Sequence, residues 1–303
     1  MMMSMRDAFG EAMAELGKTN PKILALTADL GPSVRLSAFK EAFPDRYFNV
    51  GVAEANMISV AAGLALEGFI PFCTSFAVFL PGRCFDQVRV SVCQNKANVK
   101  LIGSHSGLSN SGDGATAQSV EDIALMQALP EMTVICPADG LETKKAVKAM
   151  AENFGPIYLR ISRAETEVVT KENDPFEICK VNILRPGKRV TLIACGAMVP
   201  LVLSAAPEID GEVINLSTIK PLDRETILKS VKKTGRVITV EEHSVYGGMG
   251  SAVAEFLAHE YPVSMKIMGI QDVFGQSARN YEQLLEKYGL TVENIIRNFQ
   301  EFR

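Results

Sequence analysis

Short, nearly continuous apolar runs alternate with amphipathic stretches along the first half of the chain. The runs have the length of buried strands, and they predict strands at residues 22–28, 47–51, 69–75, 99–104, 132–136 and 156–162. Between them, apolar residues recur at helical spacing, which predicts helices near residues 5–17, 54–68, 83–94, 119–128 and 140–152. Apolar strands separated by amphipathic helices indicate a parallel sheet that is covered on both faces.

The pattern changes at residues 165–187, where charged residues, Asn173 and two prolines replace the apolar periodicity. Beyond this segment we expect strands at 189–195, 212–216, 236–240 and 264–269, with helices at 198–206, 222–232, 247–259, 280–287 and 291–300. The prediction is an α/β fold of two doubly wound domains, each a mostly parallel sheet with helices on both faces. We place the domains at residues 1–165 and 188–303, with a linker at 166–187.

Length and composition suit this organisation. A chain of 303 residues is long for one core and comfortable for two domains. A net charge of -4 argues against nucleic acid or an anionic membrane as partner. The first residues lack the basic start and apolar block of a signal peptide, and the apolar runs are too short to span a bilayer.

Cysteine and histidine usage indicates the compartment. The six cysteines are scattered without C-x-x-C spacing, and the chain has three histidines. A disulfide framework and a zinc site are therefore not expected, and we predict a cytoplasmic protein with no metal ligands of its own.

One carboxylate stands out from its surroundings. Glu54 opens a predicted helix whose other residues are mostly small or apolar, and Phe76 and Phe79 follow the next predicted strand. Because ligands in parallel α/β folds bind at the carboxyl ends of the strands, we expect these residues to lie near the loop 104–118. A carboxylate beside an aromatic slot can hold a flat heteroaromatic ring. The simpler alternatives are helix capping by Glu54, worth about 0.3–1 kcal/mol, and core packing by the two phenylalanines.

Seven segments together carry a family resemblance. They are TADLGPS (27–33), VGVAEANM (50–57), TSFAVF (74–79), SHSGLSNSGDGAT (104–116), ICPADG (135–140), ISRAE (161–165) and EEHSVYGGMG (241–250). Over nearly its whole length the chain resembles the C-terminal half of transketolases. These are thiamine-diphosphate enzymes with a diphosphate-binding, a pyrimidine-binding and a C-terminal domain. Only the last two are recognisable here, so the chain looks like the smaller subunit of a split, two-chain transketolase.

The resemblance implies a cofactor site for part of thiamine diphosphate. Glu54 would bond a ring nitrogen of the aminopyrimidine and promote its imino tautomer, which removes the proton from the thiazolium carbon. Phe76 and Phe79 would flank the pyrimidine, and Asp29 would also belong to the cofactor site. Where the family shows a further aromatic residue, this chain has Gly82.

The resemblance also implies a site for an anionic sugar. Arg6, Ser33 and Arg163 match the family's substrate-phosphate binders, and the planar fork of arginine suits an oxyanion. We add Arg160, because it ends the same predicted strand as Arg163 and we expect alternation to bring both to the same side. Taken singly, each could be a surface charge.

Two residues of the loop 104–118 match the family residues that bond the substrate's carbonyl and hydroxyl groups. These are His105, which we also predict to be catalytic, and Asp113. The simpler alternative for His105 is a solvated loop histidine. At the family's second histidine position this chain has Ala117, which predicts an atypical donor sugar or an altered rate.

Two glycine-rich segments give weaker indications of a ligand site. Residues 112–114 resemble the start of the family's magnesium motif, but no asparagine lies between Gly114 and Ala151 to complete it. The resemblance therefore places the Mg²⁺ ligands on a partner chain. The cluster at residues 247–250 is too weak to indicate a nucleotide site, and we assign no role to His243 beside it.

The function that the resemblance implies is transfer of a two-carbon ketol unit from an anionic ketose to an aldose acceptor. It requires a transketolase N-terminal subunit that shares the cofactor, and we expect an α₂β₂ assembly. Two alternatives share the cofactor: the β-subunit of a 2-oxo-acid dehydrogenase and a deoxyxylulose-phosphate-synthase-like half. A third is a non-catalytic scaffold paralogue, which the alanine at position 117 would favour.

Overall fold

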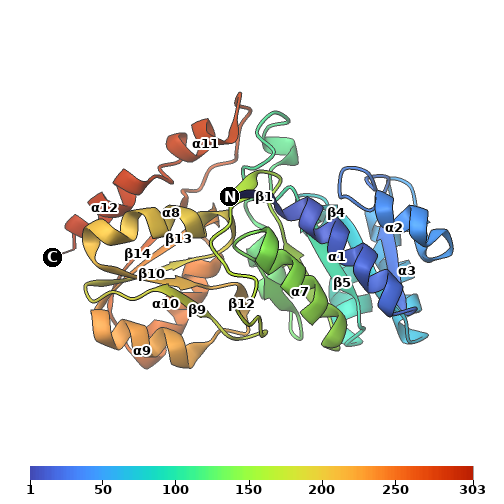
Figure 1. Ribbon diagram of the computed structural model, residues 1–303, viewed down its shortest axis with the longest axis horizontal. Helices are drawn as coiled ribbons and strands as arrows, with labels where there is room; N and C mark the ends of the chain where they lie inside the picture. Colours follow the sequence, from blue (N-terminus) through green and yellow to red (C-terminus); the bar gives the residue numbers. More distant parts are fainter. Residues whose placement is uncertain (303) are drawn as a thin grey trace.

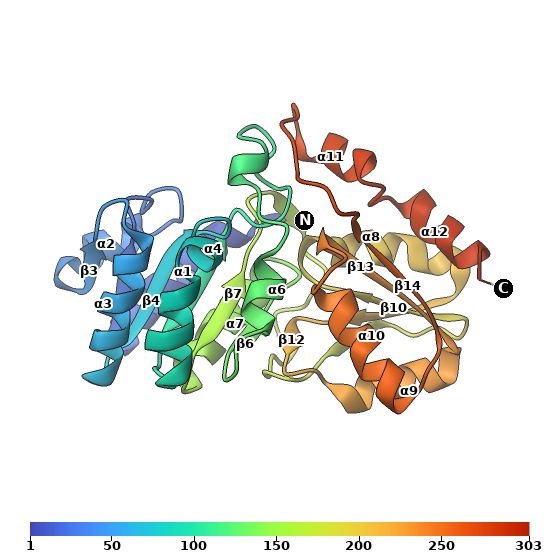
Figure 2. The same ribbon diagram turned by 180° about the vertical axis from the view of Figure 1, so that it is seen from behind.

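The computed structural model describes residues 1–302, which form two α/β units side by side (Figure 1). Each unit has a central sheet with helices on both faces, as the two opposite views show (Figures 1 and 2). The predicted fold class is confirmed.

The N-terminal sheet has seven strands in the order β12-β6-β7-β5-β4-β2-β3. All neighbouring pairs are parallel except β12 with β6. The strands are β2 (Ile23–Thr27), β3 (Tyr47–Asn49), β4 (Ile70–Phe76), β5 (Lys100–Ser104), β6 (Thr133–Ile135), β7 (Ile157–Arg160) and β12 (Thr218–Lys220). The helices are α1 (Met5–Thr19), α2 (Ser37–Ala42), α3 (Glu54–Leu66), α4 (Leu80–Arg83), α5 (Phe85–Gln87), α6 (Asp122–Gln127) and α7 (Gly140–Glu152). A short ribbon pairs β1 (Met2–Ser4) with β8 (Glu165–Glu167).

Strand β2 shows why the apolar runs are continuous. Ile23 and Ala25 join the core cluster that contains residues of α1, α2 and α7, whereas Leu24 and Leu26 join the cluster that contains residues of α3. Successive side chains of a strand point to opposite faces, so a strand with helices on both sides needs apolar residues throughout.

The predicted helix at residues 83–94 is interrupted. Helix α4 ends at Arg83, α5 covers three residues, and Val88–Gln94 forms a wider, π-type turn. Gly82 is a poor helix former, and π-type turns inside helices are frequent at functional sites. This irregular segment carries a residue of the candidate site described below.

The C-terminal sheet has the order β14-β13-β10-β11-β9, with β9 antiparallel and the other pairs parallel. Its strands are β9 (Asn182–Arg185), β10 (Val190–Ala194), β11 (Gly211–Asn215), β13 (Arg236–Ser244) and β14 (Ser264–Ile270). The helices are α8 (Val199–Ala205), α9 (Arg224–Thr234), α10 (Met249–Glu260), α11 (Tyr281–Lys287) and α12 (Val292–Gln300). Residues of α8 and α12 pack in one core cluster and those of α9 and α10 in another. Both β9 and most of β8 fall in the segment 166–187.

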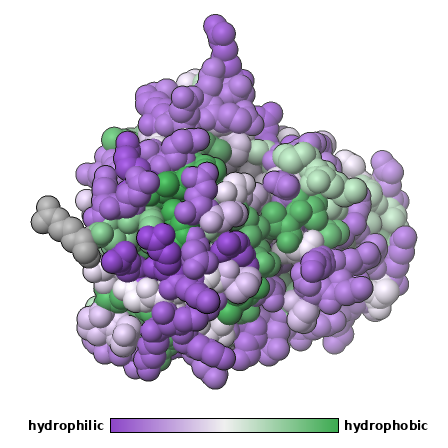
Figure 3. All heavy atoms as spheres, turned by 60° about the vertical axis from the view of Figure 1, so that its left-hand side comes forward, coloured by the Kyte–Doolittle hydropathy of each residue, from purple (hydrophilic) through white to green (hydrophobic). Residues whose placement is uncertain are grey.

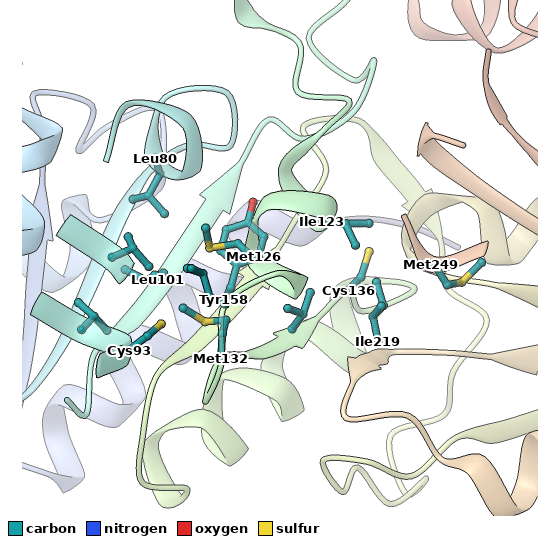
Figure 4. Close-up of a cluster of buried hydrophobic side chains, with 14 of the residues drawn as sticks. Leu80, Cys93, Leu101, Ile123, Met126, Met132, Cys136, Tyr158, Ile219 and Met249 are labelled. Carbon is teal, nitrogen blue, oxygen red and sulfur yellow. The ribbon is translucent and has the colours of Figure 1, made fainter. Parts of the chain in front are cut away.

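The two units share a strand and a core. Strand β12 follows β11 in the chain, yet it pairs with β6 of the N-terminal sheet. A single buried cluster runs from Tyr158 and Met126 of the N-terminal unit, past Cys136, to Ile219 and Met249 (Figure 4). The sequence analysis did not anticipate β12, which lies between the strand predicted at 212–216 and the helix predicted at 222–232.

Hydrophilic side chains cover most of the face drawn in Figure 3, with smaller hydrophobic areas between them. None of the helices in residues 1–302 combines the length and the apolar character needed to cross a membrane.

Candidate functional site

An open basin of about 450 Å³ lies at the carboxyl ends of strands β4 and β5. It is lined by nine residues, and six of them are residues that the sequence analysis singled out. The nine are Arg6, Pro32, Ser33, Arg35, Phe76, His105, Asn110, Asp113 and Arg163.

His105 is held firmly at the edge of the basin. It follows the last residue of β5 and is 3% exposed, with a positive φ of 57°. Its Nδ1 lies 2.9 Å from Ser104 Oγ and its Nε2 lies 3.4 Å from Arg6 Nη1. The imidazole stacks on Phe76 with ring centroids 3.8 Å apart.

The environment of His105 keeps the imidazole uncharged. Burial, and then the positive charges of Arg6, Arg163 and Arg35, lower its pKa to about 3. At neutral pH the ring can therefore donate or accept a hydrogen bond, but it adds no charge to the basin.

Three guanidinium groups supply the positive charge of the basin. Arg6, from α1, donates to the Ser33 carbonyl at 3.1 Å, and its buried Nε has no hydrogen-bond partner within residues 1–302. Burial, and then Arg35 and Arg163, lower the pKa of Arg6. Arg35 pairs with Asp7 at 2.5 Å. The sequence analysis missed Arg35, although it stands two residues after Ser33.

Asn110 links two of the predicted residues. Its Oδ1 accepts a hydrogen bond from Arg163 at 3.2 Å, and its Nδ2 donates to Asp113 at 2.9 Å. Asn110 is buried and the sequence analysis missed it, although it lies in the same Gly/Ser-rich loop as His105. Ala117 is buried in a turn of residues 115–117 and does not line the basin.

Arg160 does not reach the basin, so the expectation that it faces the same side as Arg163 is wrong. The guanidinium is buried and pairs with Asp122 at 2.9 Å, and it also donates to the Glu242 carbonyl at 2.8 Å. Strand β7 ends at Arg160, so strand alternation does not extend to Arg163, which lies in the bend that follows. Arg160 therefore ties the two units together.

A second cluster adjoins the basin. Glu54 is the first residue of α3, is 5% exposed, and forms an ion pair of 3.1 Å with Arg83. The Arg83 guanidinium lies 4.0 Å from the centroid of the Phe79 ring. Phe79 in turn stacks with Phe76 at 5.6 Å and an interplanar angle of 15°. One continuous line of contacts thus joins Glu54, through Arg83, Phe79 and Phe76, to His105.

Arg83 is a further residue that the sequence analysis missed. It follows Gly82, which is exposed, and a Cβ there would meet nothing within 4 Å. A buried carboxylate beside an aromatic face suits one end of a flat heteroaromatic ring. These residues therefore fit the pyrimidine half of thiamine diphosphate.

Asp29 does not line the basin. It is exposed at the end of β2 with a positive φ of 62°, and its Oδ1 accepts a hydrogen bond from Asn49 at 3.0 Å. Its place in a cofactor site stays a prediction. Among residues 1–302, no three His, Cys, Asp or Glu side chains gather as a metal site.

Comparison with known proteins decides the family. Residues 1–168 match the transketolase pyrimidine-binding domain and residues 179–295 match the transketolase C-terminal domain. The chain belongs to the transketolase family. This family consists of thiamine-diphosphate enzymes, and the fold of the present transketolase chain carries the two domains expected from its sequence.

Several relatives of this transketolase chain are separate subunits. It is 41% identical to the 6-deoxy-6-sulfo-D-fructose transketolase subunit of Clostridium sp. strain MSTE9, over 98% of this chain and 94% of that one. It is 36% identical to an apulose-4-phosphate transketolase subunit of Phocaeicola vulgatus, over 99% and 98%. A solved split-gene transketolase, described as an inactive β4 tetramer, matches with a TM-score of 0.89, 44% identity, and 99% and 97% coverage.

Proposed function

We propose that this chain is the C-terminal subunit of a two-chain transketolase, which transfers a two-carbon ketol unit from an anionic ketose to an aldose. The supporting observation is the continuous line of Glu54, Arg83, Phe79, Phe76 and His105, which joins a site fit for a heteroaromatic ring to an arginine-lined basin.

The cofactor end would be held by Glu54, Phe79 and Phe76. When bound, thiamine diphosphate supplies a nucleophilic carbon that accepts the ketol unit. The buried Glu54 carboxylate would share a hydrogen bond with a nitrogen of the aminopyrimidine ring. Arg83 must give up its contact with Glu54 for a ring to approach that carboxylate.

The substrate end would be held by Arg6, Arg35 and Arg163, which suit a phosphate or sulfonate. The names of two relatives agree with this class, since one acts on a sulfosugar and the other on a sugar phosphate. His105, fixed as a neutral donor or acceptor, would orient the carbonyl that reacts, and Asp113 would bond a hydroxyl.

The diphosphate and its Mg²⁺ would be bound by a partner chain, the transketolase N-terminal subunit, in an α₂β₂ assembly. The absence of the motif's asparagine from residues 115–150 and the relatives' names as subunits support this arrangement. We place the enzyme in the cytoplasm, in keeping with its six free cysteines.

The test reconstitutes the enzyme from this chain and an N-terminal subunit that carries the magnesium motif. With thiamine diphosphate and Mg²⁺, we expect ketol transfer from a ketose phosphate or sulfonate by the two chains together and none by either chain alone. Calorimetry should show weak or no cofactor binding by this chain alone.

Glu54→Ala should abolish the turnover, whereas Glu67→Ala, at the exposed opposite end of α3, should not change it. Unchanged turnover in Glu54→Ala would favour a scaffold. Release of CO₂ from a 2-oxo acid without ketol transfer would favour one of the alternatives that share the cofactor.

A further inference from the structure

The end of β13 carries three consecutive buried residues, Glu241, Glu242 and His243. They lie where the β13–β14 register shifts, so this stretch has left the regular ladder. Each side chain bonds a different element. The Glu241 carboxylate accepts hydrogen bonds from the amides of Met249 and Gly250, at 2.7 and 2.8 Å, and so caps the start of α10.

His243 bonds the N-terminal unit. Its Nε2 accepts a hydrogen bond from the Ala124 amide in α6 at 3.3 Å, and its Nδ1 donates to the Ser244 carbonyl at 2.7 Å. Glu241 and His243, which flank Glu242, therefore have clear structural roles: one caps α10 and the other bonds α6.

Glu242 bonds the loop that begins with His105. Its carboxylate accepts a hydrogen bond from the Leu108 amide. Gly107 has a φ of 59°, and a Cβ at that position would collide with the Glu242 carboxylate. The backbone of the loop at Gly107 is therefore packed directly against the Glu242 carboxylate. The Glu242 carbonyl also accepts a hydrogen bond from Arg160 at 2.8 Å.

The C-terminal unit holds this loop at a second place. Gln118 donates to the Gln276 carbonyl at 2.9 Å, and the Ala278 amide donates to the Ser111 carbonyl at 2.9 Å. Gln118 lies at the far end of the loop, and Ser111 is next to Asn110. The Glu242 contact, at Leu108, is closer in the chain to His105 than either of them.

A carboxylate is a costly choice for this position. Burial raises the pKa of Glu242 to about 7, against the opposing effects of Arg160, Tyr281 and the Leu108 amide. A neutral side chain of the same length would avoid the cost of burying a charge. We therefore look for the role of Glu242 in the Leu108 backbone that it bonds.

We propose that Glu242 is a positioning residue of the candidate active site. Its carboxylate spans from the C-terminal unit to the Leu108 amide and thereby sets where His105 stands in the basin. The effect on the loop is independent of the proposed function, and the effect on turnover rests on it.

The test compares two variants that separate the effect of side-chain length from the effect of charge. Glu242→Asp keeps the charge but is one methylene shorter, and Glu242→Gln keeps the length and an acceptor oxygen. The matched control is Glu241→Asp, which is shortened equally, sits next to it and caps α10 without touching the loop.

In Glu242→Asp we expect hydrogen exchange at the Leu108 amide to speed up about tenfold or more and the His105 imidazole NMR signals to shift. The kcat/KM of the two-chain enzyme should fall by about 100-fold, the loss typical of misplaced catalytic geometry. In Glu242→Gln, the Leu108 exchange rate, the His105 signals and kcat/KM should all stay near their wild-type values. Glu241→Asp should lower only the unfolding temperature.

Unchanged exchange at Leu108 and unchanged His105 signals in Glu242→Asp would overturn the proposal. So would faster exchange with unaltered kcat/KM in an active complex, or a loss in Glu242→Gln as large as in Glu242→Asp. If the reconstituted complex shows no ketol transfer, the proposed function fails, and the exchange and NMR readouts still decide the role of Glu242 in the loop.

Discussion

His105 shows how single residues in the basin divide their tasks. Its imidazole is stacked on Phe76 and lies beside Arg6, and its pKa of about 3 leaves it neutral over the working range of most enzymes. The charge that recognises an anion must therefore come from the arginines. Orientation of the reacting carbonyl and recognition of the anionic end are thus carried out by different side chains.

The substitution Arg163→Gln should weaken binding of anionic donors specifically. A hydrogen bond to a charged group contributes about 1.5–3 kcal/mol, so the KM for a ketose phosphate should rise by about 10- to 100-fold with little change in kcat. Steady-state kinetics on the two-chain enzyme measures this, with a donor lacking phosphate and sulfonate as the control substrate. An equal rise in KM for the uncharged donor would contradict the assignment.

Sequence motifs located most residues of the site, because each motif lies at a strand end and strand ends of a parallel sheet meet at one edge. They could not show Arg83 or Asn110. Arg83 lies one helical turn after Phe79, at the end of the four-residue α4, which is too short to stand out as a helical pattern. The loop after β5 folds Asn110 between two other side chains, and such a loop has no period that can be read along the chain.

At the scale of elements, a buried ion pair joins β7 to α6. Arg160 pairs with Asp122, which also accepts a hydrogen bond from the Tyr158 hydroxyl at 2.8 Å, and all three side chains are buried. Such a pair is weak support for stability as a whole, but its separation leaves an uncompensated charge in the core.

Asp122→Asn should therefore lower the free energy of unfolding by about 3–5 kcal/mol. Combining it with Arg160→Met should lose less than the sum of the two single changes, because the unpaired charge is then gone. Urea unfolding of the three variants measures the coupling. Additive losses would show that the pair acts as two independent residues.

The end of β13 should make stability depend on pH. The pKa of Glu242 is raised to about 7 in the fold, so its contribution is fully present below its ordinary value of 4.5 and is lost as the pH rises through 7. Arg160, Asp122 and Tyr281 face the same carboxylate.

Glu242→Gln should match wild type at or below about pH 4 and exceed it by up to about 3 kcal/mol above pH 8. The difference between the two unfolding free energies, measured across this range, checks the prediction. A difference that stays constant with pH would show that Glu242 titrates as it does in the unfolded chain.

Elements covered on both faces could be predicted from the sequence, and elements defined by a distant partner could not. All five residues of β2 and of β5 are buried, and both strands are apparent as runs in the sequence. Strand β12 has three residues, and only its pairing with β6 makes it a strand. The same holds for β9, a short edge strand in the segment 166–187.

At the scale of the whole molecule, the shared core makes two family domains one folding unit. The cluster that holds Tyr158 and Cys136 also holds Ile219 and Met249 (Figure 4). Neither unit can lose its packing without exposing apolar surface of the other.

Calorimetry of the whole chain should therefore show one cooperative transition, with equal calorimetric and van't Hoff enthalpies. Ile219→Ala, at the buried junction, should lower that transition as a whole, since truncating a buried isoleucine costs about 2–5 kcal/mol. Two resolved peaks, of which only one moves in the variant, would contradict this expectation.

The position of β12 also has a consequence for biosynthesis. When a ribosome has released residues 1–168, the edge of β6 is still open, because the segment that closes it is about 50 residues away in the chain. During synthesis the edge strand β6 therefore stays unpaired and prone to aggregation until Thr218–Lys220 emerge and pair with it.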